Sequence, residues 1–228
     1  MRHFFWLVIG LSLSILACGK NSLVTETNLE GYDQGKKTAK IQHKLYKVKL
    51  ENGKPGYRWE NLVHLAKGSK LLRKTTRTAF FREDFTLFRS EKTFQKDAQV
   101  IKTRTEVEGG QIHIHSGETE SSMQERVIEH VGPVFIDLHP AMYTKDVPKP
   151  GQSKSYPLLL EDQARIASVL VRFIGPEQFY ENQRSYQALH YQIQDHNTVS
   201  DFDDYFIDPE SKRVVKIQFG KMKFIEPP

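Results

Sequence analysis

The chain has 228 residues, a formal net charge of +5 and a single cysteine, Cys18. This length allows one domain with its own core, or two small domains. One cysteine excludes a disulfide framework within the chain, so buried apolar area must supply the stability. After residue 17, no apolar run in the sequence is long enough to span a bilayer as a helix.

Residues 1–17 have the parts of a bacterial signal peptide: a positive charge at Arg2 and an uncharged, mainly apolar core from Phe4 to Ile15. The end of this segment, Ile15-Leu16-Ala17-Cys18, resembles a lipobox. The resemblance implies that Cys18 becomes the first residue and carries diacylglycerol. Two or three acyl chains, at about 0.8 kcal/mol per buried methylene, anchor a protein stably. An ordinary secretory signal with a chance cysteine is the alternative.

Gly19 follows the cysteine, and by resemblance to lipoprotein sorting rules the lack of Asp there favours the outer membrane, with the chain facing the periplasm. Residues 18–35 are polar and predict a flexible tether. Residues 36–228 are then expected to form one β-rich domain. A chain exported from the cytoplasm is a poor partner for nucleic acid.

The segment from Lys36 to Arg77 is strongly basic. It contains 13 Lys or Arg against only Glu51 and Glu60, a net charge of +11. Such a segment could sit against anionic head groups near the anchor, at about 1 kcal/mol for each cation close to the surface. The favoured interpretation is a solvated sheet face whose lysines protect edges and aid solubility.

Short runs of alternating or apolar residues, separated by turn signals, predict strands along the rest of the chain. Asn52-Gly53 and Gly109-Gly110 are the clearest turns. The apolar segment near residues 133–143 lacks alternation and predicts one short helix or buried loop. The predicted strands are Ile41–Leu50, Tyr57–Leu65, Leu71–Arg82, Phe85–Thr93, Val100–Glu108, Gln111–Ser116, Met123–Val131, Tyr156–Leu160, Ala164–Ile174, Tyr186–His196, Phe202–Asp208 and Val214–Phe224.

This succession favours a mainly β protein: a single antiparallel sheet curled into a barrel or half-barrel. A curved sheet can fill its inner side with side chains or leave a cavity for lipid, and periodicity cannot separate the two. A packed core is the preferred interpretation. The residues that suit an inward face are Tyr57, Trp59, Val63, Leu65, Val169, Val171, Phe173, Val215, Ile217 and Phe219.

The second half resembles the half-barrels of the bacterial envelope, which include the outer-membrane lipoprotein carriers and a related uncharacterised periplasmic family. The resemblance covers about Gly132 to Phe224, and its motifs are structural. It implies a half-barrel fold, an envelope location and an apolar concavity for acyl chains, and it maps no ligand-contacting residue onto this chain. The matching stretches are Phe135–Tyr143, Pro148–Leu160, Ala164–Gly175, Tyr205–Asp208 and Arg213–Ile217.

The usual catalytic signatures, such as Gly-x-Ser-x-Gly and His-Glu-x-x-His, are missing from the sequence, and no cofactor motif is found. We therefore expect no catalytic residues and no cofactor. His113 and His115 are a weak metal candidate, because residues two apart on a strand project from one face. A third ligand would come from Glu118, Glu120 or His130. The preferred interpretation is that Ile112 and Ile114 face the core and both histidines face water.

An acidic cluster surrounds the predicted strand Phe202–Asp208, and carboxylates there could hold a hard cation or do acid–base work. The spacing lacks the regular loop of a calcium site, so solvated turn residues are preferred. His139, which precedes Pro140, is interpreted as structural. The cluster comprises Asp195, His196, Asp201, Asp203, Asp204 and Asp208.

Three functions remain open. The first is a non-catalytic, lipid-anchored envelope protein that binds a lipid, an acyl chain or a partner protein in its curved sheet. The second is a structural or assembly lipoprotein that acts through its basic surface, for which Lys44, Lys47 and Lys49 are the test positions. A hydrolase with an unrecognised site ranks last.

Overall fold

The computed structural model describes residues 21–33, 36–67, 70–139, 144, 148–194, 202–220 and 222–227. Within these residues, no helix has the length and apolar character needed to cross a membrane. All fourteen named strands belong to one sheet. They are β1 (Ser22–Asp33), β2 (Lys36–Lys49), β3 (Pro55–Lys67), β4 (Lys70–Arg82), β5 (Leu87–Lys96), β6 (Gln99–Glu108), β7 (Gln111–Gly117), β8 (Gln124–Glu129), β9 (Ser153–Leu160), β10 (Arg165–Glu181), β11 (Arg184–Gln194), β12 (Phe202–Ile207), β13 (Val214–Phe219) and β14 (Met222–Ile225).

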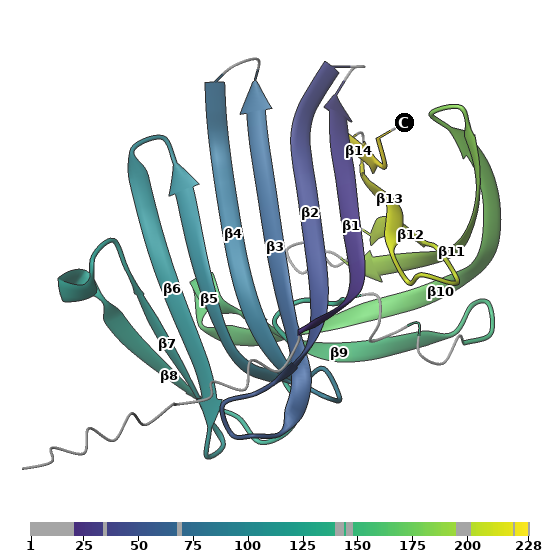
Figure 1. Ribbon diagram of the computed structural model, residues 1–228. Coiled ribbons are helices and arrows are strands. Elements are labelled where there is room, and N and C mark those ends of the chain that lie inside the picture. The colour runs from purple at the N-terminus through teal and green to yellow at the C-terminus, as the bar shows by residue number, and fades with distance from the viewer. Residues whose placement is uncertain are drawn as a thin grey trace, which may run out of the picture.

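The sheet is antiparallel throughout and follows the chain in two meanders (Figure 1). The first runs from β1 to β8 and the second from β9 to β14. They join where β1 pairs with β14, with Glu30 opposite Ile225. β8 and β9 lie at the two edges of the sheet and do not pair with each other. The sheet is therefore a curled half-barrel, as the sequence predicted.

The hairpin turns follow the glycine signals of the sequence. Gly109 and Gly110 have φ values of 59° and 83°, as a two-residue turn with both central residues left-handed requires. They join β6 to β7, with Glu108 opposite Gln111. Gly220, with a φ of 54°, splits the single strand predicted over Val214–Phe224 into β13 and β14.

The predicted tether over residues 18–35 is wrong for Ser22–Asp33, which form β1. This strand pairs with β2 along its length and with β14 at its end, so it is central to the sheet. The prediction failed because most residues of this strand are polar. Only Thr27, Leu29 and Gly31, on its inward face, are buried. Cys18 and the predicted signal peptide over residues 1–17 lie outside the described residues.

The segment predicted as a short helix or loop near residues 133–143 is a loop over its described part, 133–139. It crosses the inside of the half-barrel. Phe135 forms an isolated parallel bridge with Leu158 of β9, and the Leu87 backbone N–H donates to the carbonyl of Val134 at 2.8 Å. Residues 140–143 lie outside the described residues.

A packed core fills part of the concave side of the half-barrel. We call this part the base, and it is the region around Trp59, Phe81, Val169, Phe173 and Tyr191. β9 and β10 run across the concave side of the wall formed by the first meander (Figure 1). Trp59 and Phe81 from the first meander belong to one apolar cluster with Val169, Phe173 and Tyr191 from the second. A second apolar cluster lies between the inner faces of β1 to β3 and β13 to β14. The residues expected on the inward face are therefore divided between the packed base and the second apolar cluster.

Val215 does not share the inner face predicted for it with Ile217 and Phe219. A register irregularity opposite Phe206 and Ile207 reverses the alternation at this point. Val215 packs instead in a third cluster with Phe206 and Tyr186.

Candidate ligand-binding site in the concave face

A belt of polar side chains crosses the inner face of the first meander. Directly paired residues of antiparallel strands project from the same face, so the register places these side chains in one row. The row includes two cations, Arg77 on β4 and Lys92 on β5, which are direct partners. The belt, from β1 to β7, is Thr27, His43, Asn61, Arg77, Lys92, Thr103 and Ser116.

The belt separates two apolar levels of the same face. One step towards the base, the paired residues Leu45, Trp59 and Ala79 are buried in the main core. One step the other way, Ile41 is buried in the second apolar cluster and Val63 is half-buried against it. On one strand, the inward-facing side chain therefore lies in the packed core at one position and in the polar belt two residues further on. After two more residues it lies in the second apolar cluster.

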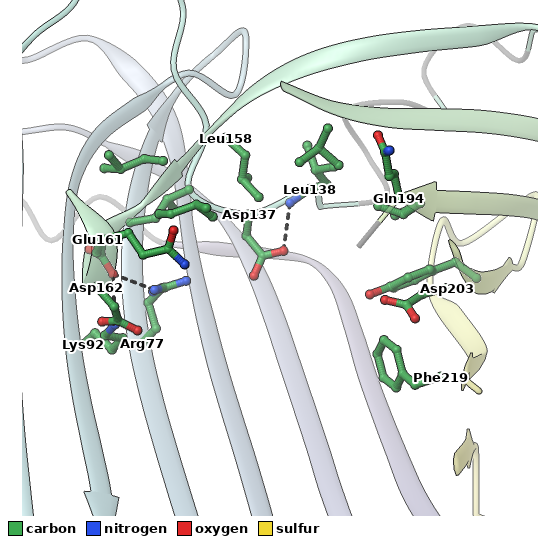
Figure 2. Close-up of a pocket in the computed structure, with 17 residues that line it drawn as sticks. Arg77, Lys92, Asp137, Leu138, Leu158, Glu161, Asp162, Gln194, Asp203 and Phe219 are labelled. Carbon is green, nitrogen blue, oxygen red and sulfur yellow. Dashed lines mark hydrogen bonds and ion pairs between the residues drawn. The ribbon is translucent and has the colours of Figure 1, made fainter. Parts of the chain in front are cut away.

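A cavity of about 480 Å³ opens beside the belt, between the two meanders (Figure 2). Its volume is within the range of small-molecule sites. Arg77, Lys92, Glu161 and Asp162 gather on one side of it, and Gln194, Asp203 and Phe219 lie on the other. Asp137 and Leu138 stand between them. The apolar part of the lining includes Ile136, Leu158, Val169, Ile193 and Phe219.

A smaller cavity of about 150 Å³ adjoins the first. The two share Asp137, Leu138, Tyr205 and Phe219 as lining residues. The smaller cavity is bordered by both apolar clusters and by His43, Trp59, Asn61 and His139. Together the two spaces run from the polar belt into the apolar interior.

Glu161 is the buried centre of an ion-pair network. It lies in the 3-10 turn Glu161–Gln163 that joins β9 to β10, and its side chain is 1% exposed. Arg77 and Lys92 reach its carboxylate at 2.6 and 3.5 Å. Ser90 and Thr105 donate to it at 2.9 and 2.6 Å. Burial alone would raise the pKa of this carboxyl, but the two cations and the two hydroxyls together hold it below its ordinary value.

The same turn holds the two meanders together through further contacts. Asp162, which is largely exposed, accepts from Lys92 Nζ at 2.6 Å. Arg126 of the edge strand β8 donates to the backbone carbonyls of Glu161 and Asp162 at 2.8 and 3.1 Å. The connection between the edge strand β9 and its neighbour is therefore bonded to the opposite edge of the half-barrel.

The interior beside the belt suppresses charge. Burial lowers the pKa of His43 to about 4. Burial, together with repulsion from His43 when both rings are protonated, lowers the pKa of His139 to about 3, so both rings are neutral at pH 7. His139 stacks on Phe85 with 6.3 Å between ring centroids, and its edge meets Trp59. Burial raises the pKa of Asp137, against the charge of Arg77 and the Leu138 N–H, which donates to it at 2.8 Å.

The two histidines of β7 lie on the convex face, as preferred. Ile112 and Ile114 are fully buried, and His113 meets Glu125 of β8 at 2.8 Å, with His115 at 3.7 Å from the same oxygen. The acidic side chain beside the two histidines is Glu125, and not Glu118, Glu120 or His130, which were the expected third ligands. Within the described ranges, no group of three or more His, Cys, Asp or Glu has the arrangement of a metal site.

The described members of the acidic cluster, Asp203, Asp204 and Asp208, have different surroundings. Asp204 bonds His190 at 2.8 Å, and Asp208 caps its own turn by accepting from the Ser211 backbone N–H at 2.7 Å. Asp203 lines the larger cavity. Asp195, His196 and Asp201 lie outside the described residues. Asp208 thus behaves as a turn residue, whereas Asp203 belongs to the candidate site.

The sequence reasoning missed the residues that organise the site, namely Arg77, Lys92, Asp137 and Glu161. Asp137 and Glu161 carried a usable signal, because each is an acidic residue next to a long apolar run. His139, interpreted as structural, packs in the core and also borders the smaller cavity.

No family model matches the chain, and no curated protein is similar to it in sequence. Among solved structures, it resembles a beta-barrel-like protein of a domain of unknown function, DUF1849, from Brucella abortus. The TM-score is 0.50 and the sequence identity 7%, over 90% of this chain and 95% of that one. At this identity the likeness establishes a barrel-like β fold and nothing of the activity.

Proposed function

We propose that the protein is a lipid-anchored component of the bacterial envelope that binds an acyl-bearing amphiphile in its concave sheet and does not act as an enzyme. The observation that carries this proposal is the paired cavity, which joins a polar belt to apolar walls within one hollow. An amphiphile needs both surfaces. A fully packed core would offer neither.

Binding is favoured over catalysis by the state of the polar groups. The carboxylate of Glu161 is saturated by four partners, and the hydroxyls of Ser90 and Thr105 serve it. Such groups stabilise the fold and are poorly placed to act as a nucleophile or as a general base. The apolar lining, with Leu158 and Phe219 half-buried, is suited to an alkyl chain, whose burial is worth about 0.8 kcal/mol per methylene.

The anchor is proposed on the lipobox at Cys18, and the position of β1 fits it. Strand pairing begins at Ser22, opposite Lys47. Four residues span at most about 14 Å, so a lipid on Cys18 would hold the start of β1 against the bilayer. Leu23 and Val24, which are exposed at 52% and 44%, would then face the membrane surface. We expect Cys18→Ser to abolish palmitate labelling and release the protein from membranes; an unlabelled wild-type protein would contradict the anchor.

Ligand binding is tested by native mass spectrometry of the full chain, extracted from membranes in mild detergent, with lipid analysis of the same sample. Leu158→Trp places an indole in the larger cavity and should remove the co-purified amphiphile. Ile174→Trp is the matched control, because Ile174 lies on β10 but is 39% exposed. Ligand in the wild type and control but not in Leu158→Trp supports the proposal. No ligand in any sample, or equal ligand in all three, overturns it.

A second candidate function, an assembly role through the basic segment, rests on two exposed lysines. Lys47 and Lys49 are exposed beside the start of β1, whereas Lys44 is 3.3 Å from Glu26 and partly neutralised. Crosslinking in cells should then trap a dominant protein partner, and Lys47→Glu with Lys49→Glu should weaken it. Loss of membrane contact alone, with no trapped partner, would contradict this role.

A further inference from the structure

The larger cavity is bordered by more acidic than basic side chains. Among the described residues, its lining includes two cations and four carboxyl groups, a formal balance of −2. Both cations are bound to the turn Glu161–Gln163, Arg77 through one salt bridge and Lys92 through two. The acidic excess of the cavity therefore consists of the two further carboxyl groups, those of Asp137 and Asp203.

Asp137 brings this acidic excess to the junction of the two cavities. Among the described lining residues, it is the one with a charged side chain that borders both. Figure 2 shows its carboxyl group directed into the space between Arg77 and Asp203. The Leu138 N–H donates to one of its oxygens at 2.8 Å. Within the described ranges, no Lys, Arg or His side chain forms an ion pair with Asp137, so its other oxygen can accept from a ligand.

The surroundings of Asp137 favour a cation as its partner. Burial raises the pKa of this carboxyl, although the nearby charge of Arg77 lowers it. The fold therefore disfavours the ionised form, and a cation in direct contact would reverse this. An anionic head group would be repelled by Asp137 and Asp203 and would compete with Glu161 for its cations. An uncharged head group would give the buried carboxylate no counter-ion.

We infer that the concave site selects an acyl-bearing amphiphile whose head group carries an ammonium, and that this ammonium donates to the carboxylate of Asp137. An ammonium is compact and has only donors, which suits a carboxylate oxygen that faces a cavity. The alkyl chain lies along the apolar walls at Leu158, Val169 and Phe219. This inference rests on the proposed function, because it names the class of amphiphile that the same hollow takes.

The head-group preference is measured by isothermal titration calorimetry of the full chain in mild detergent. Octylamine, octanoate and monooctanoylglycerol have chains of the same carbon number and differ in head-group charge, and each is added below its micellar concentration. The Leu158→Trp chain, in which an indole occupies the larger cavity, is titrated in the same way. It provides the heat that each ligand releases or takes up on entering the detergent.

Octylamine is expected to bind saturably and about tenfold more tightly than octanoate or monooctanoylglycerol, because hydrogen bonds between charged groups are the stronger ones. Asp137→Asn should remove this preference. The variant should fold normally, as circular dichroism checks, because an amide oxygen can still accept from the Leu138 N–H. Asp204→Asn is the matched control and should keep the preference, because Asp204 bonds His190 at 2.8 Å and lines neither cavity.

The outcomes separate this inference from the proposed function. Octylamine that does not bind, or that binds no more tightly than the other two ligands, overturns the ammonium class. A preference that is unchanged in Asp137→Asn, or that persists in Leu158→Trp, overturns it as well. In each of these cases a co-purified amphiphile in the mass spectra keeps the hollow as a lipid site. If none of the three ligands binds and no amphiphile co-purifies, both the inference and the proposed function are overturned.

Discussion

The base of the concave face and the polar belt two residues above it are built from the same strands and by the same alternation. At the base, Trp59, Ala79 and Phe81 pack against the second meander and are almost fully buried. At the belt, Asn61, Arg77 and Lys92 meet cavities instead of close-packed side chains. The comparison teaches that one sheet face can serve stability at one level and binding at the next. Where the second meander covers the wall, core forms. Where it stands away, a hollow remains.

The largest effect is expected at the base. Phe81→Ala leaves a cavity in a fully buried position and should lower the free energy of unfolding by about 4 kcal/mol. Phe80→Ala is the matched control, because Phe80 is half-buried on the other face under Arg89 and should cost about 1 kcal/mol. Urea unfolding followed by circular dichroism measures both. Equal losses would mean that the base is not a packed core.

The next effect is expected at the ion-pair network that borders the belt. Glu161→Ala leaves Arg77 and Lys92 without their buried carboxylate and should cost about 3 kcal/mol in the same assay. Asp162→Ala removes a side chain that is 84% exposed and should cost less than about 1 kcal/mol. A Glu161→Ala chain as stable as the wild type would show that this turn does not hold the two meanders together.

A structural feature could be predicted from the sequence where it depends on neighbouring residues, and could not where it depends on residues far apart in the chain. The turns at Asn52-Gly53 and Gly109-Gly110 and the alternation of β7 follow from neighbouring residues, so the curled antiparallel sheet was predictable. Strand β1 was missed because its pattern is largely polar. The network at Glu161 was not accessible, since its partners Arg77, Ser90 and Thr105 are 84, 71 and 56 positions away. Only the register of six strand pairs brings the belt into one row.

A smaller effect is expected when the neutral interior is forced to ionise. The pKa values of His43 and His139 in the folded chain, about 4 and about 3, lie below the unfolded value of 6.5. Between about pH 4 and pH 6.5 the unfolded chain therefore binds more protons than the folded chain. Stability is therefore complete above about pH 6.5 and falls as the pH drops towards 4. The raised pKa of Asp137 acts in the opposite direction at the acidic end. From pH 7 to pH 5 each histidine should contribute a loss of up to about 2 kcal/mol, which the opposing protonation of Asp137 reduces.

The pH dependence is measured by urea unfolding at the two pH values in the wild type and in the double variant His43→Asn, His139→Asn. The double variant should lose most of the dependence. A wild-type stability that is the same at pH 5 and pH 7 would contradict the lowered pKa values of the two histidines.

The claim that the hollow beside the belt holds an acyl chain is tested most directly by photocrosslinking in cells fed a diazirine-bearing fatty acid. The experiment uses the Cys18→Ser chain, expressed with its signal peptide, so that fatty acid attached at Cys18 does not contribute to the adducts. We predict adducts on the peptides that carry Leu158 and Phe219, lost on Leu158→Trp and kept on Ile174→Trp. Adducts confined to exposed segments, or absent altogether, would contradict the account.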